Sequence, residues 1–271
     1  MMDNPILFID SGIGGIPYCS HFQQRNPGAR IVYLADRLHF PYGKFEKTEL
    51  AEILTRLVEQ LVNVINPNIV VLACNTATIA ALAELRERFP NLPFVGTVPA
   101  VKPAALASKT GKIGVLGTEL TIKQPYIREL ASRFGSGEIC GIAAPELVEF
   151  VEGRFNSASS DEKKKIVMSY LNRFRAEGVD TLVLGCTHFL FLLDEFQREA
   201  APDITVFDSV TGISNRIESL MGEQNEETNA ALPCQQNRIL LTGPAAPEAS
   251  WVSLAERLGF SLSLLDAIKE K

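Results

Sequence analysis

Two cysteines, Cys74 and Cys186, occupy matching positions in a chain of 271 residues. Each ends a short apolar run, precedes small polar residues, and is followed 16 residues later by a proline, Pro90 or Pro202. A single cysteine in such a place is more often a small buried hydrophobe. A matched pair suggests acid–base chemistry, because a thiol has a reference pKa of about 8.5 that a helix N-terminus or a nearby charge can lower toward neutral pH. Thiols on opposite faces of one tetrahedral carbon could remove a proton from one side and deliver one from the other, which inverts that carbon.

The elements that must position these thiols follow a repeating pattern. Short runs rich in Ile and Val, typical of buried strands, alternate with longer segments whose apolar residues recur three and four apart, typical of helices. The predicted strands are 5–10, 30–36, 68–74, 93–96, 112–117, 138–144, 181–186, 204–208 and 238–243. The predicted helices are 16–24, 46–65, 77–89 and 121–135, further helices up to residue 177, and a last one near 247–258, while 221–237 is predicted to be a loop. This alternation predicts an α/β fold with mostly parallel sheets flanked by helices.

The matched cysteines and prolines also indicate two related α/β halves. We expect residues 1–97 plus 209–271 to form one lobe and residues 98–208 to form the other. Folds of this kind bind ligands at the carboxyl ends of their strands, where the following helices begin. We therefore expect two pseudo-symmetric lobes with the active site in the cleft between them.

Composition excludes several classes of function. The formal net charge is −6, which disfavours nucleic acid or an anionic membrane as a partner. Five cysteines without a CxxC pair predict free thiols in a reducing compartment. The apolar N-terminal stretch is too short for a signal peptide and nowhere do 18 apolar residues run together, so we expect a cytoplasmic protein. Three histidines and no paired cysteine spacing predict no metal site, and the oligomeric state stays open, with a homodimer as one option.

Four segments, in order along the whole chain, resemble the motif set of the glutamate racemase family within the aspartate/glutamate racemase superfamily. They are FIDSGIGG (8–15), ADRLHFPYGK (35–44), ACNTAT (73–78) and LGCTH (184–188). The resemblance implies a cofactor-independent interconversion of L- and D-glutamate that supplies D-glutamate for peptidoglycan. It also implies that glutamate is the small-molecule partner.

The resemblance assigns roles to individual residues. Cys74 and Cys186 match the two catalytic cysteines, Asp10 matches the acidic residue that assists Cys74, and His188 matches the histidine that assists Cys186. The segment PELVEFVEG (145–153) is similar to the one that ends in a helper glutamate, which is Glu152 here. The positions implied to bind substrate are Ser11, Asp36, Pro41, Tyr42, Gly43, Asn75, Thr76, Thr118, Thr121 and Thr187. Arg37 stands where the family usually has a small hydroxyl residue, which puts one expected contact in question.

Other interpretations stay open at this point. The same chemistry could act on aspartate or another small amino acid, because side-chain length is read by cleft dimensions that a sequence does not give. A bilobal amino acid sensor would bind without turnover, although we would expect such a sensor to have lost one of the two cysteines. Ser11–Gly15 could cradle a phosphate, but the segment lacks the last glycine of a dinucleotide fingerprint.

Overall fold

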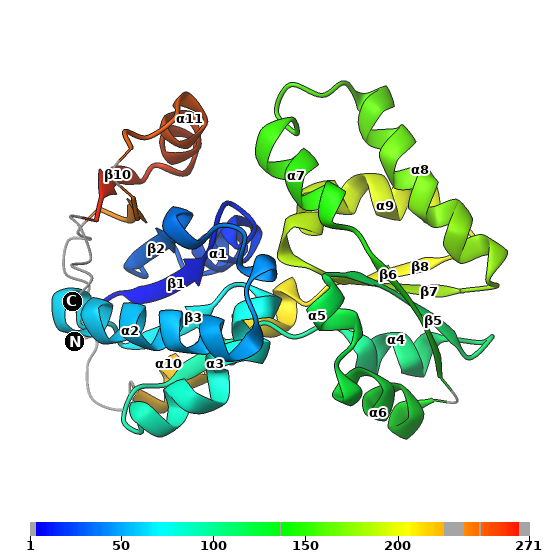
Figure 1. Cartoon of the computed structure of the whole chain (residues 1–271), viewed down its shortest axis with the longest axis horizontal. Helices are drawn as coiled ribbons and strands as arrows, with labels where there is room; N and C mark the ends of the chain where they lie inside the picture. The colour runs from blue at the N-terminus through cyan, green and yellow to red at the C-terminus, as the bar shows by residue number, and fades with distance from the viewer. Residues whose placement is uncertain (1–3, 136, 225–235, 244, 266–271) are drawn as a thin grey trace. The chain divides into compact units, whose positions relative to one another are not determined.

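Two parallel sheets organise the chain in the computed structural model, which describes residues 4–135, 137–224, 236–243 and 245–265 (Figure 1). The chain divides into unit 1, residues 1–97 and 210–271, and unit 2, residues 98–209. Each unit contains one sheet flanked by helices, so the predicted α/β fold class is confirmed. The separate folding of the two predicted lobes as domains stays a prediction.

Unit 1 contains a six-stranded sheet in the order β10-β9-β2-β1-β3-β4. The strands are β1 (Ile6–Asp10), β2 (Ile31–Ala35), β3 (Ile69–Leu72), β4 (Phe94–Gly96), β9 (Arg238–Leu241) and β10 (Ser261–Leu264). All their pairings are parallel, and β1 lies between β2 and β3 with Ile9 opposite both Leu34 and Leu72. The central strands are buried on both faces, which explains their continuous apolar sequences.

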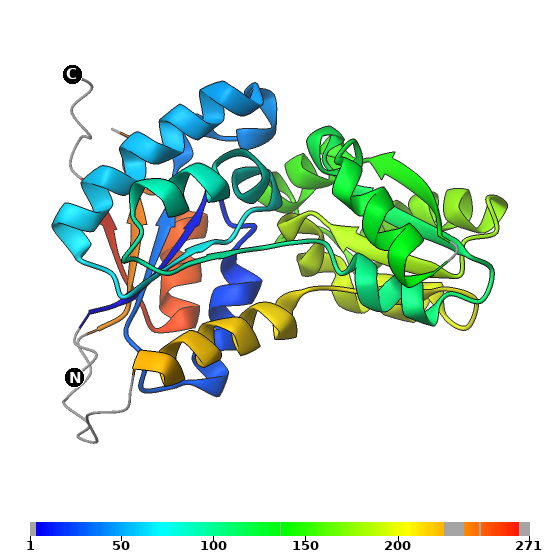
Figure 2. The same ribbon diagram turned by 90° about the horizontal axis from the view of Figure 1, so that it is seen from below.

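Helices cover both faces of this sheet (Figures 1 and 2). They are α1 (Ile16–Arg25), α2 (Lys47–Ile65), α3 (Asn75–Arg88), α10 (Val210–Gln224) and α11 (Ala249–Leu258), with two 3₁₀ turns, η1 (Arg37–His39) and η2 (Tyr42–Lys44). Leu7, Ile9 and Leu72 share one core with residues of α2 and α3. Phe8 points to the other face, where its ring packs 6.0 Å from that of Phe22 in α1.

Unit 2 contains a four-stranded parallel sheet in the order β6-β5-β7-β8. Its strands are β5 (Lys112–Gly117), β6 (Glu138–Ala143), β7 (Thr181–Gly185) and β8 (Thr205–Phe207). Its helices are α4 (Val101–Ala107), α5 (Glu119–Ile122), α6 (Pro125–Phe134), α7 (Pro145–Gly153), α8 (Ser160–Ala176) and α9 (Leu193–Ala200), with the 3₁₀ turn η3 (Thr187–Leu192). Ile113 and Val115 pack against α4 and α6 on one face.

The two sheets repeat one topology. The order β2-β1-β3-β4 in unit 1 corresponds to β6-β5-β7-β8 in unit 2, strand for strand. Cys74 follows β3 and Cys186 follows β7, and their backbones are extended with nearly the same dihedrals, φ −142° and ψ 125° against φ −133° and ψ 136°. The predicted relation between the two halves is therefore present in the strand order.

Three predictions about individual elements were wrong. The helix predicted at 121–135 is two helices, α5 and α6, because Pro125 lacks an N–H and forces Gln124 into an extended conformation. α10 extends to Gln224, so the first residues of the predicted loop 221–237 are helical, while 225–235 lie outside the described residues. The second cysteine is followed by the 3₁₀ turn η3 before α9 begins, rather than directly by an α-helix. The short elements α4 and β10 and the longer helix α10 were not predicted.

Gly96→Ala is expected to lower the free energy of unfolding by about 1–3 kcal/mol, because a Cβ there would lie 2.5 Å from Thr78 Cγ2 and 2.8 Å from Leu82 Cδ2. Thr78 is buried and β-branched, so it cannot easily move aside. Urea unfolding of both proteins measures the difference. Gly28→Ala is the matched control, with an expected change below about 0.5 kcal/mol, because a Cβ at Gly28 meets nothing within 4 Å. Equal losses in the two variants would contradict the packing argument.

Candidate functional site

In unit 1 the predicted site residues lie where three neighbouring parallel strands end. Asp10 ends β1, Asp36 follows β2, and Cys74 follows β3. Burial raises the pKa of the Tyr42 hydroxyl well above its ordinary value, and the charges of Asp36, Cys74 and Asp10 raise it further. These four side chains therefore share one electrostatic neighbourhood, and Tyr42 keeps its proton at neutral pH.

Asp10 is fully buried and shapes the loop that follows it. Its Oδ1 accepts a hydrogen bond from the Gly12 N–H at 2.9 Å and a longer one from the Ser11 hydroxyl at 3.4 Å. The Tyr33 hydroxyl donates to the Gly12 carbonyl at 2.8 Å. A Cβ on Gly15 would lie 2.6 Å from Ala73 Cβ, so only glycine lets this loop lie against the strand end that carries the first cysteine.

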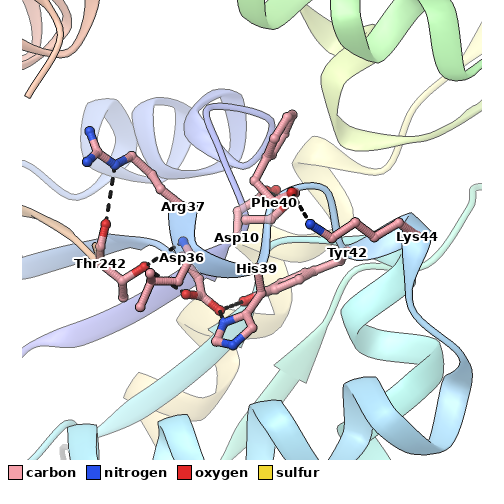
Figure 3. Close-up of polar contacts among 10 residues, drawn as sticks. Asp10, Asp36, Arg37, His39, Phe40, Tyr42, Lys44 and Thr242 are labelled. Atoms are coloured by element: carbon pink, nitrogen blue, oxygen red, sulfur yellow. Dashed lines mark hydrogen bonds and ion pairs between the residues drawn. The ribbon is translucent and has the colours of Figure 1, made fainter. Parts of the chain in front are cut away.

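Asp36 is also fully buried, and its carboxylate is satisfied by side chains of unit 1 (Figure 3). Oδ1 accepts from the Thr242 hydroxyl at 2.7 Å, while Oδ2 accepts from the Tyr42 hydroxyl at 3.0 Å and lies 2.8 Å from His39 Nδ1. Pro41 and Gly43, on either side of Tyr42, are exposed. Asp36 thus contacts the segment that carries the predicted substrate-binding residues Pro41, Tyr42 and Gly43.

Cys74 is the N-cap of α3 and is 8% exposed. Asn75 and Thr76, both buried, form the first turn of this helix. The amide groups of a first helical turn point outward and carry partial positive charge, which favours a carboxylate nearby.

In unit 2 the second cysteine begins a chain of three side chains. Cys186 Sγ lies 3.9 Å from His188 Nδ1, and His188 Nε2 lies 2.7 Å from Glu152 Oε1. Cys186 and His188 are 6% and 4% exposed, whereas the Glu152 side chain, at the end of α7, is 20% exposed. The geometry suits an imidazole that exchanges a proton with the thiol while a carboxylate holds its far nitrogen.

The pKa of His188 is well above its ordinary value of 6.5. Burial alone would lower it, but the hydrogen bonds with Cys186 and Glu152, together with the charges of these two groups, outweigh burial. An imidazolium at neutral pH is therefore favoured beside the thiol.

The predicted threonines of unit 2 lie at the same edge of its sheet. Thr118 follows β5 and caps α5, with its Oγ1 accepting from the Thr121 N–H at 3.2 Å. The two threonine hydroxyls are 2.9 Å apart, and Thr121 is fully buried against Gly117 and Gly185. Thr187 is the first residue of η3 and is buried.

Several partners of these residues were not predicted from the sequence. His39 and Thr242 bind the Asp36 carboxylate, and the Tyr170 hydroxyl donates to Glu146 in the first turn of α7, the helix that carries Glu152. No local signal identifies Thr242, because its contact with Asp36 depends on β9 pairing with β2. None pairs Tyr170 with Glu146 either, because the sequence does not reveal how α7 and α8 are aligned.

Within the described ranges, no group of three His, Cys, Asp or Glu side chains is arranged to hold a metal ion. None of the described cysteines, Cys19, Cys74, Cys140 and Cys186, forms a disulfide, and Cys234 lies outside the described residues. No helix in the described part of the chain is long and apolar enough to cross a membrane.

Comparison with known proteins gives one consistent result. Residues 29–213 match the family described as Asp/Glu/Hydantoin racemase. The chain is 40% identical to the glutamate racemase of Sphingopyxis alaskensis over 82% of this chain and 84% of that protein. It is 36% identical to the glutamate racemase of Ectopseudomonas mendocina over 88% of this chain and 89% of that protein.

Solved structures agree with the sequence relatives. The fold is similar to that of Escherichia coli glutamate racemase in complex with L-glutamate and the activator UDP-MurNAc-ala, with a TM-score of 0.81 and 31% identity over 97% of this chain and 98% of that one. Glutamate racemase from Aquifex pyrophilus gives a TM-score of 0.72 at 26% identity over 97% and 99% of the two chains.

Glu152→Gln is expected to lower the pKa of His188, because the variant removes the carboxylate charge while keeping the size of the side chain. NMR titration of the imidazole measures this shift. A folded-state pKa above the unfolded value of about 6.5 gives stability that is fully present below that pH and is lost as the pH rises through the folded pKa. The free energy of unfolding should therefore fall less in Glu152→Gln than in the wild type as the pH rises through this window.

Glu149→Gln is the matched control, since Glu149 is an exposed carboxylate on the same helix. It should leave the His188 titration and the pH dependence of stability unchanged. Identical titration curves for Glu152→Gln and Glu149→Gln would rule out Glu152 as the group that raises the pKa.

Proposed function

This chain belongs to the Asp/Glu/Hydantoin racemase family, and we propose that it interconverts L-glutamate and D-glutamate without a cofactor. We further propose that it acts in the cytoplasm and supplies D-glutamate for peptidoglycan. The two glutamate racemases described above align with more than four fifths of this chain, which supports glutamate as the substrate.

One observation carries the proposed mechanism. Two cysteines stand at equivalent places in two sheets of the same strand order, and each has its own acid–base neighbours in its own unit. Cys74 has Asp10 and the buried Tyr42 near it, and Cys186 has His188 backed by Glu152. A one-base enzyme needs one such arrangement, whereas inversion of a carbon needs two.

In the proposed reaction the two thiols act on opposite faces of a single Cα. From L-glutamate, the Cys186 thiolate takes the α-proton and the Cys74 thiol donates its own proton to the other face. The products of this step are D-glutamate, a Cys186 thiol and a Cys74 thiolate, so Cys186 must lose a proton and Cys74 must gain one before the next turnover in that direction. The conversion of D- to L-glutamate runs the same steps in reverse. His188 and Asp10 exchange protons with, or orient, their respective thiols.

The remaining site residues bind the zwitterion. Helix N-terminal amides and the side chains of Asn75, Thr76 and Thr187 can donate to the carboxylates of glutamate. Ser11, Tyr42 and Gly43 provide further donors from the two loops of unit 1, and Thr118 and Thr121 provide hydroxyls from unit 2. Preorganised donors of this kind stabilise the developing carbanion without an electron-sink cofactor.

Cys74→Ala and Cys186→Ala are each expected to lower racemisation of glutamate by at least about 100-fold, because each removes one acid–base group. Circular dichroism with L-glutamate, D-glutamate and L-aspartate in turn measures the rates and tests which amino acid is preferred. In D₂O, the wild type should place deuterium at Cα of the product enantiomer before it appears in the remaining substrate.

Cys140→Ala is the matched control, since Cys140 is a half-buried free thiol of β6, outside the proposed site. It should retain the wild-type rate. Full activity in Cys74→Ala or in Cys186→Ala would refute the two-base mechanism, and glutamate binding without any change in optical rotation would favour a sensor.

A further inference from the structure

The chain that follows β9 lies against the segment that follows β2. These strands pair in parallel with Ala35 opposite Leu241, and the Thr242 N–H continues the ladder by donating to the Ala35 carbonyl at 3.1 Å. The next residue of each strand, Asp36 or Thr242, therefore reaches the same edge of the sheet. Two segments about 200 residues apart in sequence are neighbours because of this pairing.

The Thr242 hydroxyl joins these segments through two hydrogen bonds (Figure 3). It donates to Asp36 Oδ1 at 2.7 Å and accepts from the Leu38 N–H at 3.1 Å. Asp36 in turn binds Tyr42 and His39 through its other oxygen. A buried carboxylate needs such donors, because leaving a buried charge unpaired is costly.

Arg37 adds a second set of contacts between the same segments, and all three of its nitrogens take part. Nε donates to the Thr242 carbonyl at 3.3 Å, Nη2 to the Ala245 carbonyl at 2.9 Å, and Nη1 to Glu248 Oε2 at 2.9 Å. The Arg37 side chain is only 14% exposed, whereas that of Glu248 is 60% exposed. The two carbonyl contacts require the planar fork of a guanidinium, which a lysine or a small hydroxyl residue lacks.

The turn after β9 fits this arrangement. Gly243 has a φ of +100°, which favours glycine, and a Cβ placed on it would lie 3.7 Å from Arg37 Nη2 and from Leu38 Cδ2. The residues after β9 are thus both hydrogen-bonded to and packed against the start of the segment that carries Tyr42.

We propose that Arg37 is a positioning residue for substrate binding, which fixes the segment of Pro41, Tyr42 and Gly43 by tying it to Thr242, Ala245 and Glu248. The inference rests on the proposed function, since that function gives this segment its contact with glutamate. Arg37 does not touch the reacting thiols in this account. It acts through the segment, so its loss weakens binding more than it slows proton transfer.

Arg37→Ala is expected to raise KM for glutamate on the order of tenfold, with kcat changed by less than about threefold. The two enantiomers are equally stable, so kcat/KM must fall by the same factor in both directions. Thr242→Val keeps the shape of the side chain but removes its hydrogen bonds to Asp36 and Leu38. It should likewise raise KM while leaving kcat nearly unchanged. Arg37→Lys should lie between the wild type and Arg37→Ala, because the single ammonium nitrogen of lysine cannot occupy the positions of all three guanidinium nitrogens.

Arg25→Ala is the matched control, since it removes another arginine of unit 1 from an ion pair, with Glu218 at 2.7 Å, away from this segment. It should leave KM and kcat unchanged even if it lowers the thermal midpoint. A purely structural role for Arg37 would likewise lower the midpoint without moving KM. A KM in Arg37→Ala within about twofold of the wild type would overturn the proposal.

A second readout needs no turnover. Trp251, the single tryptophan of the chain, is buried in α11 just after Glu248, so acrylamide quenching of its fluorescence reports how firmly this part is held. Quenching should increase in Arg37→Ala and not in Arg25→Ala. If the wild type does not racemise glutamate, the proposed function fails, and unchanged quenching in Arg37→Ala would separately refute the link itself.

Discussion

Parallel strand pairing is the constraint on which the candidate site depends. In each sheet the carboxyl ends of the strands meet at one edge, and backbone hydrogen bonds continue past the last paired residues. The Asp36 N–H donates to the Asp10 carbonyl at 2.8 Å and the Ala73 N–H donates to the Ile9 carbonyl at 2.8 Å, so the residues of the candidate site leave the sheet from fixed backbone positions. Loops need only arrange side chains whose Cα atoms are already placed.

The same scaffold carries two different acid–base environments. After β3, a cysteine stands among two buried carboxylates and a neutral tyrosine, and after β7 a cysteine stands beside a histidine that favours its charged form. Strand order repeats between the units, but the residues that follow the strands do not: Asp36 follows β2, whereas Ala144 follows β6. The strand order thus fixes where each cysteine follows its sheet, and the local sequence determines which side chains surround each thiol. One repeated fold can therefore place chemically different neighbours beside two cysteines at equivalent positions.

The sequence predicted the α/β fold and most strands, because continuous Ile and Val runs and helical periodicity are local signals. It did not predict the break before Pro125, although proline restricts the residue before it in a known way. The histidine partner Glu152 came only from resemblance, since nothing in a helix sequence marks which carboxylate faces a distant imidazole. The hydroxyl of Thr242 was missed because its role depends on which strand pairs with β2, and strand order over long separations is not encoded in local pattern.

The pairing of β9 with β2 explains why this chain can carry Arg37 at all. A guanidinium that turned inward would compete with Thr242 and Tyr42 for the oxygens of the buried Asp36. Instead, two backbone carbonyls and Glu248, all from residues after β9, take its donors and hold it away from Asp36. The Asp36 oxygens are left to accept hydrogen bonds from Thr242 and Tyr42 and to contact His39. The residues after β9 therefore make Arg37 compatible with the candidate site at the ends of β1, β2 and β3.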